Sequence, residues 1–213
     1  MAQIVTMQAN YSKKEEMWNA ITHGLGFVLA IPATWALIQK AQANGSATEL
    51  GSYLLFGIAM MVLYLSSTLY HALPIYKDFF KKMDHSAIFL LIAGTYAPIA
   101  LIAVGGTLGW VILGIELALA AIGIVLKFYF VHRFKRASLI VYIAMGWLII
   151  FAYKPLLAQI GTEGFLWLLA GGLWYTVGTY FYRNDNIRYN HAIWHLFVLA
   201  GSACMYITVL LYL

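Results

Sequence analysis

Residues 107–130 read TLGWVILGIELALAAIGIVLKFYF, and their only charged side chains are Glu116 and Lys127. A transmembrane α-helix needs about 20 consecutive, mostly apolar residues. The stretch therefore predicts a helix that crosses a bilayer. Glu116 is unusual, because a carboxylate in the middle of such a helix is costly and often functional. It could pair with a neighbouring helix, be protonated or line a cavity, and these three alternatives stay open.

The rest of the chain has the same character. Of its 213 residues 63% are hydrophobic and only 10% are charged, whereas soluble proteins carry about 25% charged residues. We therefore predict an all-α membrane protein, a seven-transmembrane helix bundle over residues 20–213 after an N-terminal tail over residues 1–19. The seven expected spans cover about 20–40, 50–71, 85–104, 107–130, 137–154, 163–182 and 191–212.

The distribution of Lys and Arg predicts the orientation. Eleven of these residues fall on the side that holds the N-terminus, and only Lys40 and Lys154 fall on the other. Lys and Arg accumulate in cytoplasmic loops. We therefore expect a cytoplasmic N-terminus and, after seven spans, an external C-terminus.

The same distribution argues against nucleic acid as a partner. The net charge of +5 is spread over short loops, which topology explains better. The first 20 residues are polar, so no cleavable signal peptide is expected. The single cysteine, Cys204, lies in an apolar segment and can form no intrachain disulfide.

Three histidines are predicted at the cytoplasmic ends of their helices. His71 closes the second expected span, and His191 and His195 open the seventh in the run H191-A-I-W-H195. Residues four apart share one helix face, so two imidazoles at that spacing can chelate one ion. Three His ligands with an open position suit a catalytic zinc, Zn²⁺.

Two further residues are expected at the same depth. Ser67 lies one turn before His71, where its hydroxyl could bond a water on the metal or fix a ligand. Asp84, at the start of the third span, could support a ligand or act as a general base. The histidine pair alone is weak evidence, because two interfacial histidines would give the same spacing. The agreement of five residues favours a metal site.

These motifs resemble those of a known family. S67-T-L-Y-H71, D84-H-S, A93-G-T-Y-A-P98 and H191-A-I-W-H195 are similar to those of bacterial hemolysin III proteins, within the progestin and adipoQ receptor family. The resemblance covers nearly the whole chain. It implies a seven-helix fold in the bacterial inner membrane and one zinc held by His71, His191 and His195. It also implies roles at that site for Ser67 and Asp84.

The sequence supports only weaker predictions for the remaining polar residues. Glu16, Asn19 and His23 match the family's opening E-x-x-N-x-x-x-H pattern and share roughly one helix face. They could face the metal pocket or support the entry of the helix. His85 is expected at the interface, pointing away from Asp84, and His132 in water or lipid headgroups.

Several functions fit these residues. The first is a zinc-dependent hydrolase of a lipid amide or ester, with water on the zinc as the nucleophile, Asp84 as its base and Ser67 beside the oxyanion. The second is a membrane sensor or regulator with a structural zinc. A cytolytic protein and a proton-linked transporter are weaker alternatives. The expected partners are membrane lipids and a lipid-like substrate or ligand.

Overall fold

The computed structural model describes residues 11–213, which form helices and short connections without strands. The predicted all-α class is confirmed. A π-helix follows α3 and a 3₁₀-helix follows α5. The elements are α1 (Lys13–Asn44), α2 (Ala47–Ala72), α3 (Lys77–Pro98), η1 (Ile99–Val104), α4 (Gly106–Phe130), α5 (Lys135–Trp147), η2 (Leu148–Ala152), α6 (Tyr153–Arg183) and α7 (Asn190–Tyr212).

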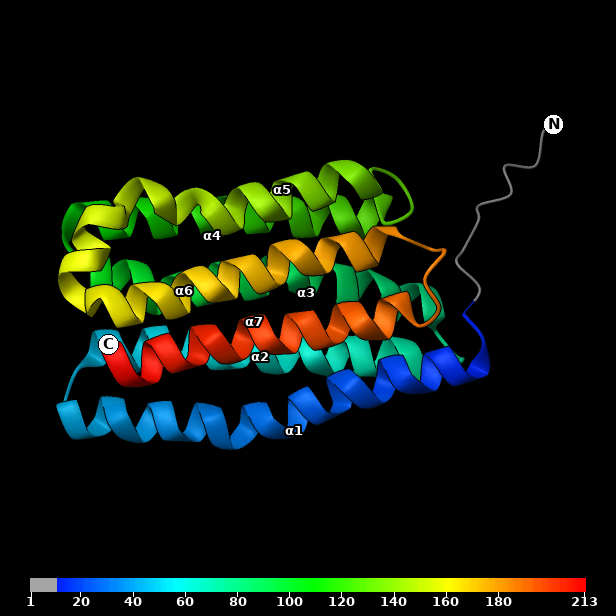
Figure 1. The fold of residues 1–213 in the computed structure, drawn as a ribbon, viewed down its shortest axis with the longest axis horizontal. Helices are drawn as coiled ribbons and strands as arrows, with labels where there is room; N and C mark the ends of the chain where they lie inside the picture. Colours follow the sequence, from blue (N-terminus) through cyan, green and yellow to red (C-terminus); the bar gives the residue numbers. More distant parts are fainter. Residues whose placement is uncertain (1–10) are drawn as a thin grey trace.

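Six helical stretches among these residues are long and apolar enough to cross a membrane. The described part of the chain has six such stretches and not the predicted seven, because the expected spans 137–154 and 163–182 belong to one stretch of 48 residues, Arg136–Arg183. This stretch is bent. Gly161 has φ 65° and ψ −179°, and the chain turns back between α5 and α6, which lie roughly alongside each other (Figure 1). Glycine reaches such a positive φ without a steric penalty.

The first helix begins earlier than the sequence suggested. The Ser12 hydroxyl accepts a hydrogen bond from the backbone N–H of Glu15, whose carboxylate accepts one from the Ser12 N–H. This capping box starts α1 at Lys13. Residues 13–19 of the predicted tail are thus helical, and residues 1–10 lie outside the described part. The division into a tail and a membrane domain stays a prediction.

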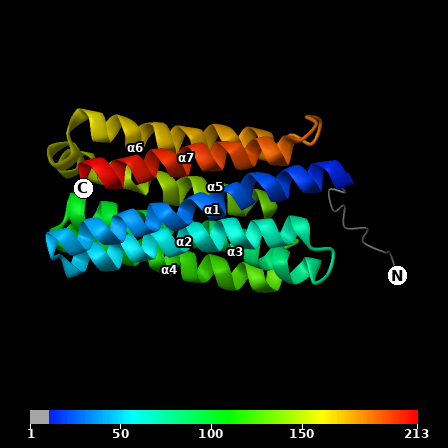
Figure 2. The same cartoon turned by 90° about the horizontal axis from the view of Figure 1, so that it is seen from below.

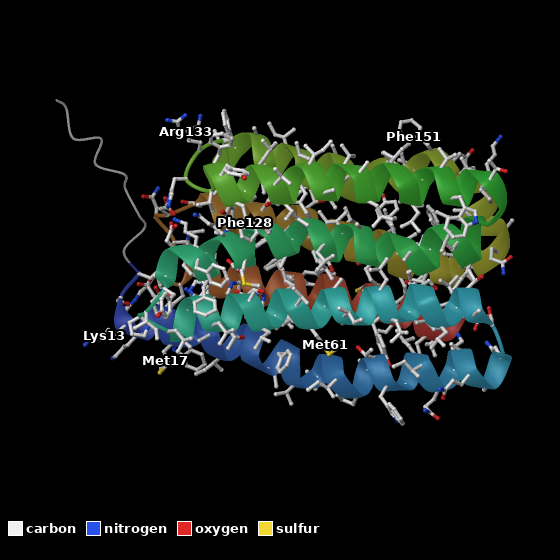
Figure 3. All side chains as sticks on the ribbon, turned by 180° about the vertical axis from the view of Figure 1, so that it is seen from behind. Lys13, Met17, Met61, Phe128, Arg133 and Phe151 are labelled. Atoms are coloured by element: carbon white, nitrogen blue, oxygen red, sulfur yellow. The ribbon has the colours of Figure 1, made fainter. Side chains whose placement is uncertain are left out.

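The helices run back and forth between two ends of the bundle. Helix α7 lies between α1 and α6 in both views (Figures 1 and 2). Lys13 and Arg133 lie at the end where α1 begins, which we call the basic end, and Phe151 lies towards the other (Figure 3). The C-terminus is at the end opposite the start of α1 (Figure 1). Which end faces the cytoplasm stays a prediction.

The distribution of polar and apolar side chains is that of a multi-pass membrane protein. Large apolar residues are exposed along the helices, for example Val28 and Trp35 on α1. Asn19, Ser67 and His195 are fully or almost fully buried. Lipid solvates exposed apolar side chains, whereas polar groups inside the bundle need partners from other helices.

Glu116 is one of the buried polar residues that the fold leaves without such a partner. Its side chain is 0% exposed, and neither carboxylate oxygen accepts a hydrogen bond from any residue in 11–213. Pairing with a neighbouring helix, one of the three alternatives, is therefore not found among the described residues. An unpaired carboxylate anion at this position would carry a large desolvation cost.

We expect Glu116→Gln to leave the stability unchanged or to raise it by up to about 2 kcal/mol, because the amide keeps the shape and cannot ionise. Thermal unfolding of the purified protein measures this. The control is Glu163→Gln, which changes an exposed glutamate at the end of the bundle opposite the basic end. It should have no effect on the stability. A marked loss of stability in Glu116→Gln alone would mean that the carboxylate has a required partner.

Candidate metal centre

The three predicted histidines lie together at the basic end. His71 is in the last turn of α2, and His191 and His195 are in the first turns of α7. Asn190 orders the start of α7, since its side-chain oxygen accepts a hydrogen bond from the His191 N–H at 2.8 Å. All three imidazoles are buried, and one nitrogen of each lies within 4.8 Å of the other two. These side chains could hold a metal ion.

The unpaired nitrogens of the cluster are consistent with metal binding. Nε2 of His71 and both ring nitrogens of His191 are buried without a hydrogen-bond partner among residues 11–213. Buried polar atoms are normally paired, because leaving them unpaired costs free energy. A metal ion would satisfy these nitrogens, and neutral imidazole is a common metal ligand.

Helix α1 holds two of the three imidazoles in place. Nδ1 of His71 lies 2.5 Å from a carboxylate oxygen of Glu16, whose other oxygen accepts a hydrogen bond from Lys77 at 2.8 Å. Nδ1 of His195 donates to the Asn19 carbonyl at 3.0 Å. Since carboxylates and carbonyls only accept, each Nδ1 carries the proton, and the Nε2 lone pair is free to bind a metal.

Ser67 and Asp84 are close to the cluster but outside the group of three. The Ser67 hydroxyl is fully buried and lies 3.5 Å from Nε2 of His195. Asp84 is buried on α3 and lines the same cavity as His191 and His195. One of its oxygens is 3.5 Å from Nδ1 of His85. All five predicted site residues thus occupy one region, and the roles of Ser67 and Asp84 stay predictions.

The opening E-x-x-N-x-x-x-H pattern faces the cluster. Besides the contacts of Glu16 and Asn19, the His23 ring stacks on the His195 ring, with centroids 3.5 Å apart and an interplanar angle of 10°. His132 is exposed and lies 2.8 Å from Asp78, as expected of a loop histidine. His85 lies beside its own helix, with Nδ1 2.9 Å from the Lys81 carbonyl.

Thr22 and Tyr11 are among the residues near the cluster that the sequence analysis did not identify. The Thr22 hydroxyl lies 3.0 Å from Nδ1 of His195. It could have been found, because it lies three residues after Asn19 on the same helix face. The Tyr11 ring lies over His191, with centroids 5.3 Å apart, and burial raises the pKa of its hydroxyl well above the usual range. Nothing in the sequence indicated that contact.

An apolar cavity leads from the cluster into the bundle. Its polar lining includes His23, Asp84 and the two α7 histidines, and most of the rest is aliphatic or aromatic. Both Tyr182 and Phe165 of α6 contribute to its wall. At 1.5 Å per residue these two are about 25 Å apart along the helix. An acyl chain reaches across about half of a 30 Å hydrocarbon core, so the cavity is long enough for one.

A second pocket, which we call the mouth pocket, opens at the basic end. It is polar and carries charged residues of both signs from α1, α3, α5, α6 and the loop before α7. The two cavities share part of their lining, namely His85, Leu139, Tyr182 and His191. The histidine cluster therefore lies where an apolar cavity meets a polar one.

Comparison with known proteins agrees with the sequence resemblance. Residues 11–206 match the model of the family described as "Haemolysin-III related". The chain is 51% identical to "Hemolysin-3" of Bacillus cereus over 93% of this chain and 92% of that protein. It is 50% identical to "Hemolysin-3 homolog" of Bacillus subtilis (strain 168), over 95% and 96%. "Monocyte to macrophage differentiation factor" of Homo sapiens is 28% identical over 93% and 84%.

We expect His71→Ala, His191→Ala and His195→Ala each to lose most of the metal, Zn²⁺ by prediction, because each removes one of three nitrogen ligands. Elemental analysis of the purified variants measures this. His132→Ala, which changes an exposed histidine at the same end, is the matched control and should keep the metal. Metal contents like that of the unaltered protein in all three variants would show that the cluster is not the site.

We also expect Glu16→Gln to weaken zinc binding about 10–100-fold, because the carboxylate that orients His71 is lost. Competition with a chelating dye gives the affinity. Glu15→Gln removes the same charge one residue away, where the carboxylate contacts Ser12 and Tyr189 but no histidine. Equal effects of the two changes would mean that Glu16 acts only through its negative charge and not by orienting His71.

Proposed function

The chain belongs to the haemolysin-III related family, and we propose that it is a zinc-dependent hydrolase that cleaves an amide or ester bond of a membrane lipid. One observation carries the proposal. The histidine cluster lies at the junction of an apolar cavity and a polar pocket, and the two share His191 and Tyr182. An amphiphile in both cavities would hold its acyl chain in the first, its headgroup in the second and the linking bond at the cluster.

The membrane setting is part of the proposal. The basic end would face the cytoplasm of a bacterial cell, and the protein would be a multi-pass protein of the inner membrane. The eleven Lys and Arg residues predicted for one side support this orientation. Substrate would then come from the membrane itself, with its headgroup at the cytoplasmic surface.

The side chains beside the cluster suit hydrolysis. A bound zinc ion would supply a Lewis acid that polarises the carbonyl and makes water nucleophilic near neutral pH. The Asp84 carboxylate would accept the proton of the attacking water and then pass it to the leaving amine or alcohol. The Ser67 hydroxyl would donate a hydrogen bond to the carbonyl oxygen as negative charge develops on it. Glu16 and Asn19 would keep the imidazoles oriented.

We expect Asp84→Asn to keep most of the zinc and to lower the hydrolysis rate about 10²–10⁴-fold, because asparagine keeps the shape but cannot act as a base. Zinc content and the turnover of a broad panel of acyl lipids, followed by mass spectrometry, test this. Asp78→Asn is the control, since Asp78 is exposed on the same helix and pairs with Lys82 and His132.

Two outcomes would contradict the proposal in different ways. A parallel loss of zinc and activity in Asp84→Asn would make Asp84 a ligand instead of a base. No turnover of any lipid by the zinc-loaded, unaltered protein would favour a regulator in which zinc joins α2 to α7. In that case Asp84→Asn should lower the unfolding temperature, with no rate to affect.

A further inference from the structure

The mouth pocket contains more positive than negative side chains. Five cationic residues line it, against the three carboxylates of Glu15, Glu16 and Asp185. The cations come from four different elements: Lys77, Lys81, Arg136, Arg183 and Arg188. This excess lies beside the histidine cluster, because His191 belongs to the same lining.

The carboxylates of the pocket already have partners. Glu16 contacts His71 and Lys77. Glu15 accepts hydrogen bonds from Ser12 and, at 3.3 Å, from the Tyr189 N–H. Asp185 accepts one from the Asn190 amide at 3.4 Å. By contrast, the guanidinium groups of Arg136 and Arg183 form no ion pair or hydrogen bond with any residue in 11–213. Two exposed guanidinium groups therefore line the pocket with donors that no described residue uses.

The general preference for positive residues at a cytoplasmic face does not explain why Arg136 and Arg183 both line the mouth pocket. Arg133 lies at the same end of the bundle (Figure 3) and is exposed, as Arg136 and Arg183 are, yet it does not line the mouth pocket. Arg136 lies in the first turn of α5 and Arg183 ends α6, so two separate helices bring a guanidinium to one cavity. Guanidinium groups bind phosphate oxygens with two parallel hydrogen bonds and are favoured for that reason at phosphate sites.

We infer that the mouth pocket binds the phosphate group of an amphiphile through Arg136 and Arg183, with the acyl chain in the apolar cavity. The lipid class would be a phospholipid or lysophospholipid with an anionic headgroup, as opposed to a neutral lipid. The cleavage of this lipid rests on the proposed function. The binding of its phosphate is independent of the proposed function, because neither arginine belongs to the histidine cluster.

Binding to the full-length protein in neutral detergent micelles tests the inference. The probes are n-dodecyl phosphate, n-dodecanol and inorganic phosphate, with the unfolding temperature and calorimetry as readouts. Dodecyl phosphate should bind at least about tenfold more tightly than either other probe. Arg136→Gln and Arg183→Gln should each weaken it about tenfold or more, the effect of losing a hydrogen bond to a charged group. Arg133→Gln, the matched loss of one charge, should not.

Three results would overturn the inference. Equal weakening by Arg133→Gln would leave only general surface charge. Equally tight binding of inorganic phosphate would make free phosphate the ligand, and equally tight binding of dodecanol would remove any role for the phosphate. The unfolding temperature without a probe shows whether each variant is folded. Zinc-depleted protein should bind dodecyl phosphate as before, so a protein that binds it but cleaves no lipid loses the hydrolase proposal and keeps this one.

Discussion

The hydrogen bonds that His71 and His195 make to α1 fix the arrangement of the centre. An imidazole inside a bilayer protein has no bulk water as an alternative partner, so its ring must be held by the neighbouring helices. The Glu16 carboxylate and the Asn19 carbonyl each accept a hydrogen bond from one Nδ1–H, and this leaves Nε2 of both rings for a metal. The packing of α1 against α2 and α7 is therefore also what shapes the metal centre.

The polarity of the surroundings follows from the depth of the centre. Towards the middle of the bundle the walls are apolar, and towards the basic end they carry charges. A site between them can hold a molecule with two different ends without burying its charged part. The same depth gives Asp84 a buried setting near the histidines, where electrostatic interactions are stronger than in water.

The sequence predicted which histidines lie together better than it predicted the division of the chain into helices. Hydropathy and the i, i+4 spacing were sufficient to bring His71, His191 and His195 to one end, because helix length and alternation determine which ends meet. The prediction of two separate stretches failed around Gly161, where apolar residues continue through a bend and helical turns persist on both sides. The contacts of Thr22 and Tyr11 depend on side-chain packing between helices, which spacing along one helix does not determine.

The distance in sequence between the ligands has a consequence for biosynthesis. Protein chains are made from the N-terminus onward, so α7 emerges only after the six helices before it. A chain released before α7 would contain His71 and the orienting residues of α1 but would lack His191 and His195. Such a fragment would have one of three nitrogen ligands and could assemble no centre. Incomplete chains would thus lack the candidate metal site altogether.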